Sequence, residues 1–178
     1  MSKNRGAFKA GSFVLVLVTL AGCYSTEMPV IGKGEKAPLA GEHACENAMT
    51  GEMETWSYTE QKSGAFRPDF TYIDGDGVET KLVEMAEGLR LVQAKSQSGN
   101  FNYGYIDFID DDRFILSVAD MMSKGPYIEA LAESSGVMFG SGAEPGEIAL
   151  DGNEGDILAF LLAHDKSMLS AYLSCTRQ

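Results

Sequence analysis

Several residue types on which enzymes and metal proteins depend are scarce in this sequence. Its 178 residues include three cysteines, two histidines and one tryptophan. The nucleophile motifs G-x-S-x-G and S-x-x-K are absent, and no segment follows the EF-hand spacing of acidic residues and glycine. We therefore expect no catalytic residue, no metal site and no cofactor.

Positive charge is also scarce. Lysine and arginine together number 14, against 26 aspartates and glutamates, which gives a net charge of −12. A chain this acidic repels the phosphate backbone of nucleic acids, so we exclude nucleic acid as a partner. The charge would attract a cationic partner, although an acidic surface is also typical of a protein that simply stays soluble.

No apolar run is long enough to cross a membrane. The best candidate, the uncharged segment 10–20, falls short of the roughly 20 apolar residues that a spanning helix needs. Three basic residues precede it, and the small residues Ala21 and Gly22 follow it. This pattern is typical of a secretory signal peptide, so we expect residues 1–22 to be removed.

The residues around the expected cut, Leu20-Ala21-Gly22-Cys23, resemble the lipobox of bacterial lipoproteins. The resemblance implies that Cys23 carries a diacylglycerol and an acylated amino group, and two or more acyl chains hold a protein stably on a membrane. Tyr24 stands where the enterobacterial inner-membrane retention signal has aspartate, which implies the outer membrane, facing the periplasm. The alternative is that Cys23 is an ordinary buried thiol.

The chain after the cut divides into two parts. Residues 23–42 are rich in proline and glycine, and we expect them to form a flexible tether between the lipid and the folded part. Residues 43–178 are numerous enough for a single domain with its own hydrophobic core.

Two cysteines, Cys45 and Cys175, lie just inside the two ends of that domain. In an oxidising compartment such a pair predicts a disulfide bond. The bond would close a loop of about 130 residues and stabilise the domain by on the order of 5 kcal/mol. Two separate buried thiols are the alternative.

Alternating apolar and polar residues predict an antiparallel meander in the middle of the chain. The region 43–60 fits two interpretations, because Trp56 and Tyr58 share a strand face whereas Cys45, Met49, Met53 and Trp56 share a helical stripe. The expected strands of the meander are residues 69–73, 78–83, 89–94, 100–109 and 113–119.

After Asp120 the pattern changes to helical spacing. Pro126 suits the first turn of one helix, and Asn153 or Asp156 can cap a second. Two short strands are expected between the helices, near 137–139 and 147–150, and a last strand carries Cys175. The sequence therefore predicts a single α+β domain, an antiparallel meander of about five to eight strands followed by two helices and a C-terminal strand. The apolar stripe expected on the second helix comprises Ile157, Phe160, Leu161, His164 and Met168.

Two resemblances bear on function. The strand LRLVQAK, the aromatic strand after it and a small C-terminal helix resemble groups of uncharacterised proteobacterial envelope lipoproteins, which implies no activity. The segment Ser98-Gly99-Asn100-Phe101-Asn102-Tyr103 is similar to the Ser-Gly-x-x-Tyr element of membrane-bound lysozyme inhibitors, which implies a cationic protein partner. The element is one residue longer here, and no tryptophan follows for their second motif.

We expect a non-catalytic module that binds or scaffolds a partner in the cell envelope. The competing hypothesis is a hydrolase with two carboxylates, such as Asp107 with Glu129 or Glu133. Neither histidine is assigned a catalytic role, because His43 lies at the end of the tether and His164 lies on an apolar helical stripe.

Overall fold

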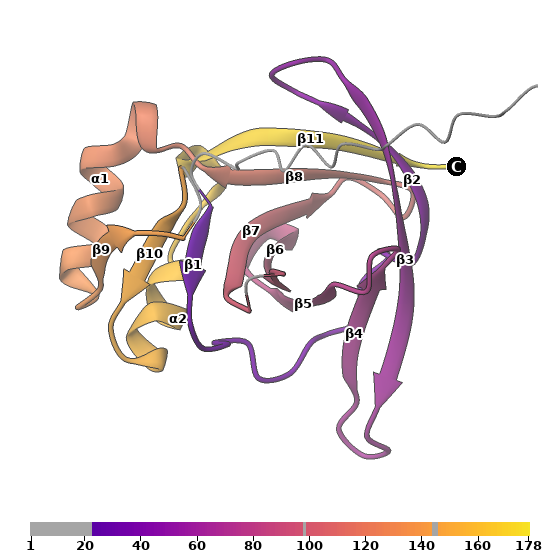
Figure 1. The fold of residues 1–178 in the computed structure, drawn as a ribbon, viewed down its shortest axis with the longest axis horizontal. Helices are drawn as coiled ribbons and strands as arrows, with labels where there is room; N and C mark the ends of the chain where they lie inside the picture. The colour runs from indigo at the N-terminus through magenta and orange to yellow at the C-terminus, as the bar shows by residue number, and fades with distance from the viewer. Residues whose placement is uncertain (1–22, 98, 144–145) are drawn as a thin grey trace, which may run out of the picture.

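Eight antiparallel strands close into a barrel in the computed structural model of the protein (Figure 1). The structure describes residues 23–97, 99–143 and 146–178. Each strand of the barrel pairs with the next one around it, and the last pairs with the first. In order around the barrel, the strands are β2 (Gly41–Asn47), β3 (Met53–Ser63), β4 (Asp69–Asp74), β5 (Glu79–Glu84), β6 (Leu89–Lys95), β7 (Phe101–Phe108), β8 (Arg113–Ala119) and β11 (Leu169–Arg177).

Three short strands and two helices lie against one side of the barrel (Figure 1). Strand β1 pairs with the first part of β7 in antiparallel fashion and with β10 in parallel, and β10 pairs with β9. Single-turn 3-10 helices precede β6 and β11, at Ala86–Gly88 and Lys166–Met168. The bounds of the other elements are Tyr24–Thr26 for β1, Met138–Ser141 for β9, Ile148–Asp151 for β10, Met121–Ser134 for α1 and Glu154–Leu162 for α2.

The expected α+β fold with an open meander is wrong. Consecutive strands β4 to β8 do form a meander, but β11 pairs with both β8 and β2 and thereby closes the sheet. Side chains alternate with a period of two in an open sheet and in a barrel alike, so the alternation does not specify closure. The region 43–60, which fitted either a strand or a helix, lies in the β2–β3 hairpin that supplies the partner of β11.

The barrel interior is a packed core, called here the interior core. An eight-stranded barrel is just wide enough for its own side chains to fill. All eight strands contribute to this cluster, with Cys45, Trp56, Tyr72, Leu82, Val92, Ile106, Phe114 and Leu173 as one member from each.

A second hydrophobic cluster, the outer core, covers the outside of β6 and β7. Leu91 and Tyr105 alternate with the interior residues of these strands and so face outward. Phe160 and Leu161 of α2 pack over them, together with Tyr24 of β1. The helix that the sequence predicts here is therefore present, and Asn153 caps it by accepting a hydrogen bond from the backbone of Asp156.

The first helix begins earlier than expected. Asp120 caps it by accepting a hydrogen bond from the backbone N–H of Ser123, so α1 starts at Met121 and Pro126 lies inside it rather than in its first turn. The second helix ends at Leu162, and His164, which the apolar stripe placed on the helix, follows its end.

Residues 23–42 belong to the fold, so the expected flexible tether is wrong. Tyr24–Thr26 form a fully buried strand, and the apolar side chains of Val30, Ile31 and Leu39 are buried as well. Burying each such side chain is favourable by about 1.5–3 kcal/mol, which offsets the entropy lost when a segment rich in proline and glycine becomes ordered.

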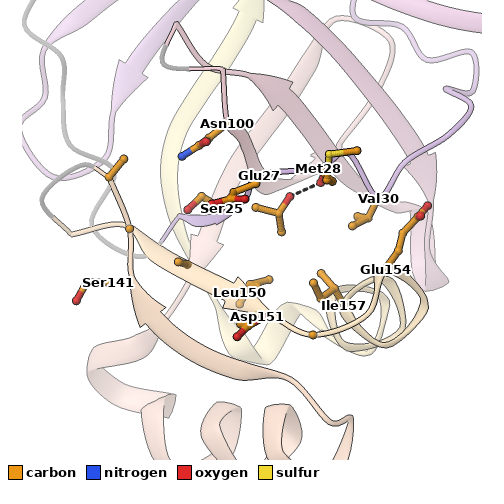
Figure 2. Close-up of a pocket in the computed structure, with 15 residues that line it drawn as sticks. Ser25, Glu27, Met28, Val30, Asn100, Ser141, Leu150, Asp151, Glu154 and Ile157 are labelled. Atoms are coloured by element: carbon orange, nitrogen blue, oxygen red, sulfur yellow. Dashed lines mark hydrogen bonds between the residues drawn. The ribbon is translucent and has the colours of Figure 1, made fainter.

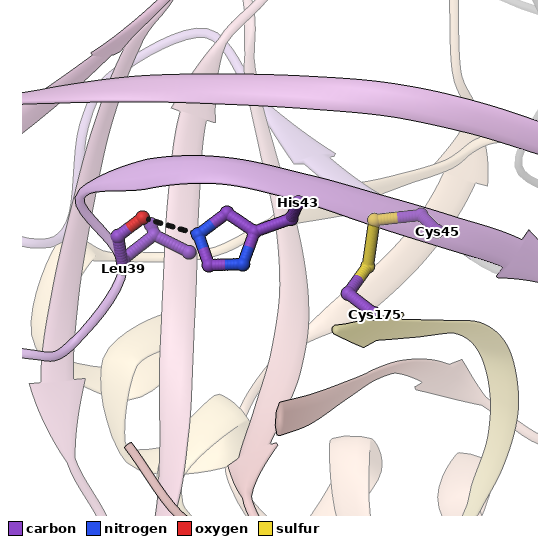
Figure 3. Close-up of a disulfide and its surroundings, with 4 residues drawn as sticks. All are labelled: Leu39, His43, Cys45 and Cys175. Carbon is purple, nitrogen blue, oxygen red and sulfur yellow. Dashed lines mark hydrogen bonds between the residues drawn. A yellow bond between two sulfur atoms is a disulfide. The ribbon is translucent and has the colours of Figure 1, made fainter. Parts of the chain in front are cut away.

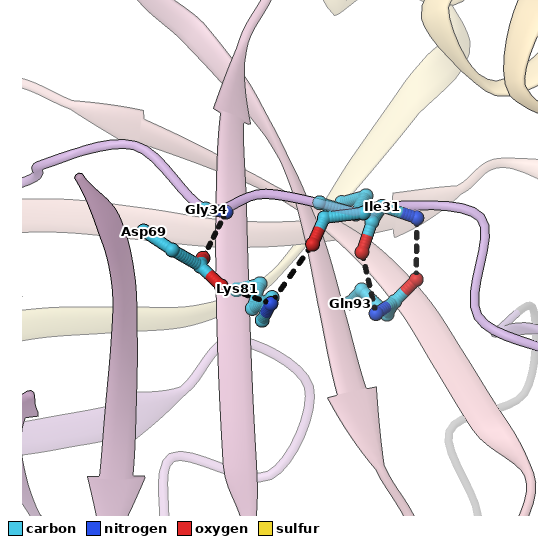
Figure 4. Close-up of polar contacts among 6 residues, drawn as sticks. Ile31, Gly34, Asp69, Lys81 and Gln93 are labelled. Atoms are coloured by element: carbon cyan, nitrogen blue, oxygen red, sulfur yellow. Dashed lines mark hydrogen bonds and ion pairs between the residues drawn. The ribbon is translucent and has the colours of Figure 1, made fainter. Parts of the chain in front are cut away.

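Residues 27–40, called here the strap, cross the outside of the barrel and then pass between β4 and β5 (Figure 4). The β4–β5 ladder is short, and the strap bridges its open part: Gly34 accepts a backbone hydrogen bond from Phe70, and Glu35 donates one to Leu82. Position 34 requires glycine, because a Cβ there would lie 2.0 Å from the carbonyl oxygen of Phe70. Beyond this point Leu39 enters the interior core.

Polar side chains hold the strap on the barrel. The Gln93 side chain accepts hydrogen bonds from the backbone N–H groups of Val30, at 2.9 Å, and Ile31, at 2.8 Å. The bond with Ile31 is drawn in Figure 4. Lys81 forms an ion pair with Asp69 at 2.9 Å, and the Asp69 carboxylate accepts a hydrogen bond from the backbone of Gly34 at 2.8 Å. The strap therefore has specific contacts along its length.

The predicted disulfide bond between Cys45 and Cys175 is present (Figure 3). The two residues face each other across the β2–β11 ladder, with their Cα atoms 4.0 Å apart. Because β2 and β11 are the pair that completes the barrel, the disulfide fastens the closure itself.

Candidate functional site

A cleft of about 760 Å³ opens beside β1 (Figure 2). Its walls come from residues 25–28, from the β9–β10 hairpin and from the start of α2, and Asn100 closes one side. Ligand-binding pockets commonly have volumes of about 300–1,000 Å³, so the cleft has the size of a binding site.

Acidic side chains surround this cleft. Glu27, Asp151 and Glu154 line it, and all three are exposed to solvent. Among the described lining residues none is a lysine, an arginine or a histidine, and the described part of the chain contains no ion pair to any of the three carboxylates. The cleft therefore has a negative rim without internal compensation.

Ser25 lines the cleft and is almost completely buried, with 2% of its surface exposed. Its hydroxyl makes no hydrogen bond to any residue that the structure describes. Asn102, its direct neighbour across the β1–β7 ladder, has a buried side-chain oxygen that also has no partner within the described residues. Because the Ser25 hydroxyl is not a fully enclosed atom, it reaches solvent through the cleft, where a ligand can supply the hydrogen bond that the described residues do not.

The cleft also has an apolar side. Val30, Leu150 and Ile157 belong both to its lining and to the outer core. A ligand that fills the cleft would therefore meet a carboxylate rim, the Ser25 hydroxyl and an aliphatic surface.

His164 is buried in the outer core and is structural. Its Nδ1 lies 3.0 Å from the carbonyl oxygen of Phe160, which only accepts, so Nδ1 carries the proton. Nε2 then accepts a hydrogen bond from the Tyr24 hydroxyl at 3.0 Å, and the ring stacks on Tyr105. Burial lowers the pKa of His164 from 6.5 to about 4, so the ring stays neutral. The packed role expected for it is confirmed.

His43 lies inside the barrel rather than at the end of a tether (Figure 3). Its Nε2 donates a hydrogen bond to the carbonyl oxygen of Leu39 at 2.9 Å, and its ring meets Phe114 edge to face. Burial lowers the pKa of His43. The side chain is fully enclosed, which removes it from contact with a substrate.

The carboxylates of the hydrolase hypothesis are not assembled into one site. Asp107 forms an ion pair with Lys166 at 2.7 Å. Glu129 and Glu133 line a different groove, between α1 and β9, and Asp107 is not part of that lining. The described residues also hold no cluster of three or more potential metal ligands.

Cys23 is buried immediately before β1. Its carbonyl oxygen accepts a hydrogen bond from the backbone of Ile148, and burial, together with the nearby Glu147 carboxylate, raises the pKa of its thiol to about 12. The expected signal peptide, residues 1–22 with the first three lipobox positions, lies outside the described residues. Within the described ranges, neither helix has the length and apolar character needed to cross a membrane.

The acidic residues of the cleft could not be identified from the sequence. Glu27 lies in the segment for which a flexible tether was expected, and Asp151 lies just before α2. No local signal marks them, because they meet only through the parallel pairing of β1 with β10. Comparison of the chain with family models, with curated proteins and with solved structures gives no significant match.

Proposed function

We propose that this protein is a lipoprotein of the bacterial envelope, anchored through Cys23 in the outer membrane and facing the periplasm. In this proposal it is a non-catalytic module that binds an envelope partner in the cleft beside β1. The observation that carries the proposal is the unpartnered hydroxyl of Ser25 at the cleft. The described lining contains no histidine, cysteine or lysine that would activate a serine, which favours binding over catalysis.

Because residues 23–26 are ordered, the binding site lies closer to the lipid than a flexible tether would place it. Ser25 follows Cys23 by two residues, and two extended residues span about 7 Å. An acylated Cys23, whose side chain would have to leave the buried position it has in the unmodified chain, would therefore hold the barrel directly against the membrane surface, with the cleft beside the anchor rather than at the end of a tether.

Anchoring is tested with the variant Cys23→Ser, compared with the unmodified chain in its own cells. We expect the variant to lose both fatty-acid labelling and membrane fractionation. A variant that is still labelled and still sediments with membranes would contradict anchoring through Cys23.

Use of the cleft is tested by photo-crosslinking in intact envelopes. A photoreactive amino acid replaces either Met28, which lines the cleft and is 72% exposed, or Phe66, which lies on the β3–β4 loop and is 100% exposed. We expect a discrete adduct from position 28 and none from position 66. No adduct from position 28, or the same adduct from both positions, would contradict the cleft as the binding site.

A further inference from the structure

We infer that the cleft binds the side chain of a lysine or an arginine presented by a protein partner. This inference rests on the proposed function, because it names the ligand class of the same cleft. The ligand is a positively charged group at the end of an aliphatic stem, and three independent features of the cleft select it.

The first feature is charge. Three exposed carboxylates, those of Glu27, Asp151 and Glu154, line the cleft, and the described residues supply no cation that pairs with them. An anionic ligand would meet uncompensated repulsion there, whereas a cation is attracted both by the rim and by a chain of net charge −12.

The second feature is hydrogen bonding. The three carboxylates accept hydrogen bonds only, and the Ser25 hydroxyl, which also lines the cleft, is able to accept as well. An ammonium group offers three donors and no acceptor, and a guanidinium offers five. A purely apolar ligand would leave the Ser25 hydroxyl and the three carboxylates without partners.

The third feature is the aliphatic side of the cleft. Lysine and arginine bury their methylene stems along apolar surface while the charged head stays at a polar edge. Val30, Leu150 and Ile157 provide such a surface below the acidic rim. A bare metal ion would use none of it, and the described residues hold no metal-binding cluster.

The test is an NMR titration of the isotope-labelled, lipidated chain in detergent micelles. The probes are the peptides acetyl-Gly-Lys-Gly-amide and acetyl-Gly-Arg-Gly-amide, with acetyl-Gly-acetyllysine-Gly-amide as the neutral control. We expect the two basic peptides to shift the signals of Ser25 and Asp151 and to bind at least tenfold more tightly than the acetyllysine peptide. Equal affinity for the acetyllysine peptide would overturn the inference.

Two double variants distinguish the effect of the cleft carboxylates on peptide affinity from the effect of the overall charge of the chain. The double variant Glu27→Gln/Asp151→Asn should weaken binding of the lysine peptide about tenfold, since exposed ion pairs contribute about 0.2–1 kcal/mol each and the two removed here converge on one group. The matched control Glu79→Gln/Asp111→Asn removes the same charge from exposed positions outside the lining and should leave the affinity within twofold. An equal loss in the control would overturn the inference.

The last comparison distinguishes the source of the amine. Butylammonium carries the same charged head and stem as a lysine side chain but no peptide backbone, and we expect it to bind more weakly than the lysine peptide. Equal or tighter binding of butylammonium would overturn the assignment to a protein partner. If position 28 still gives its adduct in envelopes while no basic probe binds, the ligand class is wrong and the binding function stands.

Discussion

The interior core and the outer core share strands β6 and β7, whose side chains face the two cores alternately. The disulfide between Cys45 and Cys175 lies in the interior core and joins the two strands that complete the barrel. The outer core has no such bond among the described residues; instead it surrounds a neutral histidine, His164, with aromatic rings. The stability of the interior core therefore depends on a covalent bond, and the stability of the outer core depends on His164 staying neutral.

This difference can be measured, because each core contains residues whose spectroscopic signals can be followed separately. Trp56, the only tryptophan of the chain, packs against the interior core. Tyr24, Tyr103 and Tyr105 are buried in the outer core. Tryptophan fluorescence therefore reports on the first core, and the individually assigned NMR signals of these three tyrosine rings report on the second.

Removing the disulfide should have the largest effect. The double variant Cys45→Ala/Cys175→Ala opens a loop whose ends are 130 residues apart in sequence, and the expected loss of unfolding free energy is on the order of 5 kcal/mol. Urea unfolding followed by Trp56 fluorescence measures it. An unchanged midpoint and slope would show that strand pairing alone closes the barrel.

The closure of the barrel also marks the limit of what the sequence predicts. The meander, the cap at Asn153 and the pairing of Cys45 with Cys175 follow from local alternation, a short-range hydrogen bond and the count of cysteines. Closure and the path of the strap depend on backbone pairing between residues far apart in the chain, such as Asn47 with Leu173 and Gly34 with Phe70. The flexible tether was predicted from its glycines and prolines, but its buried apolar residues determine the structure.

The candidate cleft shows the same limit more strongly. Its acidic residues lie on segments that are remote in sequence, and Ser25 lies in a three-residue strand too short to show an alternation of its own. A single sequence specifies the composition of such a site but not its assembly.

Acid should loosen the outer core before the interior core. The pKa of His164 is 6.5 in the unfolded chain and about 4 in the folded protein, so between these values the unfolded chain binds a proton that the folded one excludes. The stabilisation is complete above pH 6.5, falls as the pH decreases and is lost below pH 4, a change of about 3 kcal/mol. The NMR signals of Tyr24, Tyr103 and Tyr105 should respond at a higher pH than the fluorescence of Trp56.

The control for this prediction is His164→Gln, which keeps a polar side chain but does not titrate. The variant is expected to be less stable at neutral pH, and its stability should decline less steeply between pH 6.5 and 4. The pKa of His43 is also lowered, so His43 adds to the pH dependence of the unfolding free energy in both proteins. The test therefore compares the slope of the variant with the slope of the parent. The same slope in the variant and the parent would contradict the role given to His164.

The smallest effect is expected at the strap, which passes from the outer core to the interior core. Lys81 forms an ion pair with Asp69 and donates a hydrogen bond to the carbonyl oxygen of Gly32. Although burial opposes it, the hydrogen bonds from Lys81 and Gly34 hold the pKa of Asp69 below its ordinary value. Lys81→Met removes the charge but keeps the aliphatic stem, and because the pair is partly exposed we expect a loss of about 1 kcal/mol.

Hydrogen exchange shows where that loss falls. In Lys81→Met the amides of Ile31 and Gly34 should exchange faster, while those of β2 and β11 keep their protection, because the strap opens without opening the barrel. Lys166→Met is the matched control, since it removes an ion pair of similar length, with Asp107, at a position away from the strap. Faster exchange of the strap in both variants, or in neither, would mean that the contacts of Lys81 do not fasten the strap and that its apolar residues alone connect the two cores.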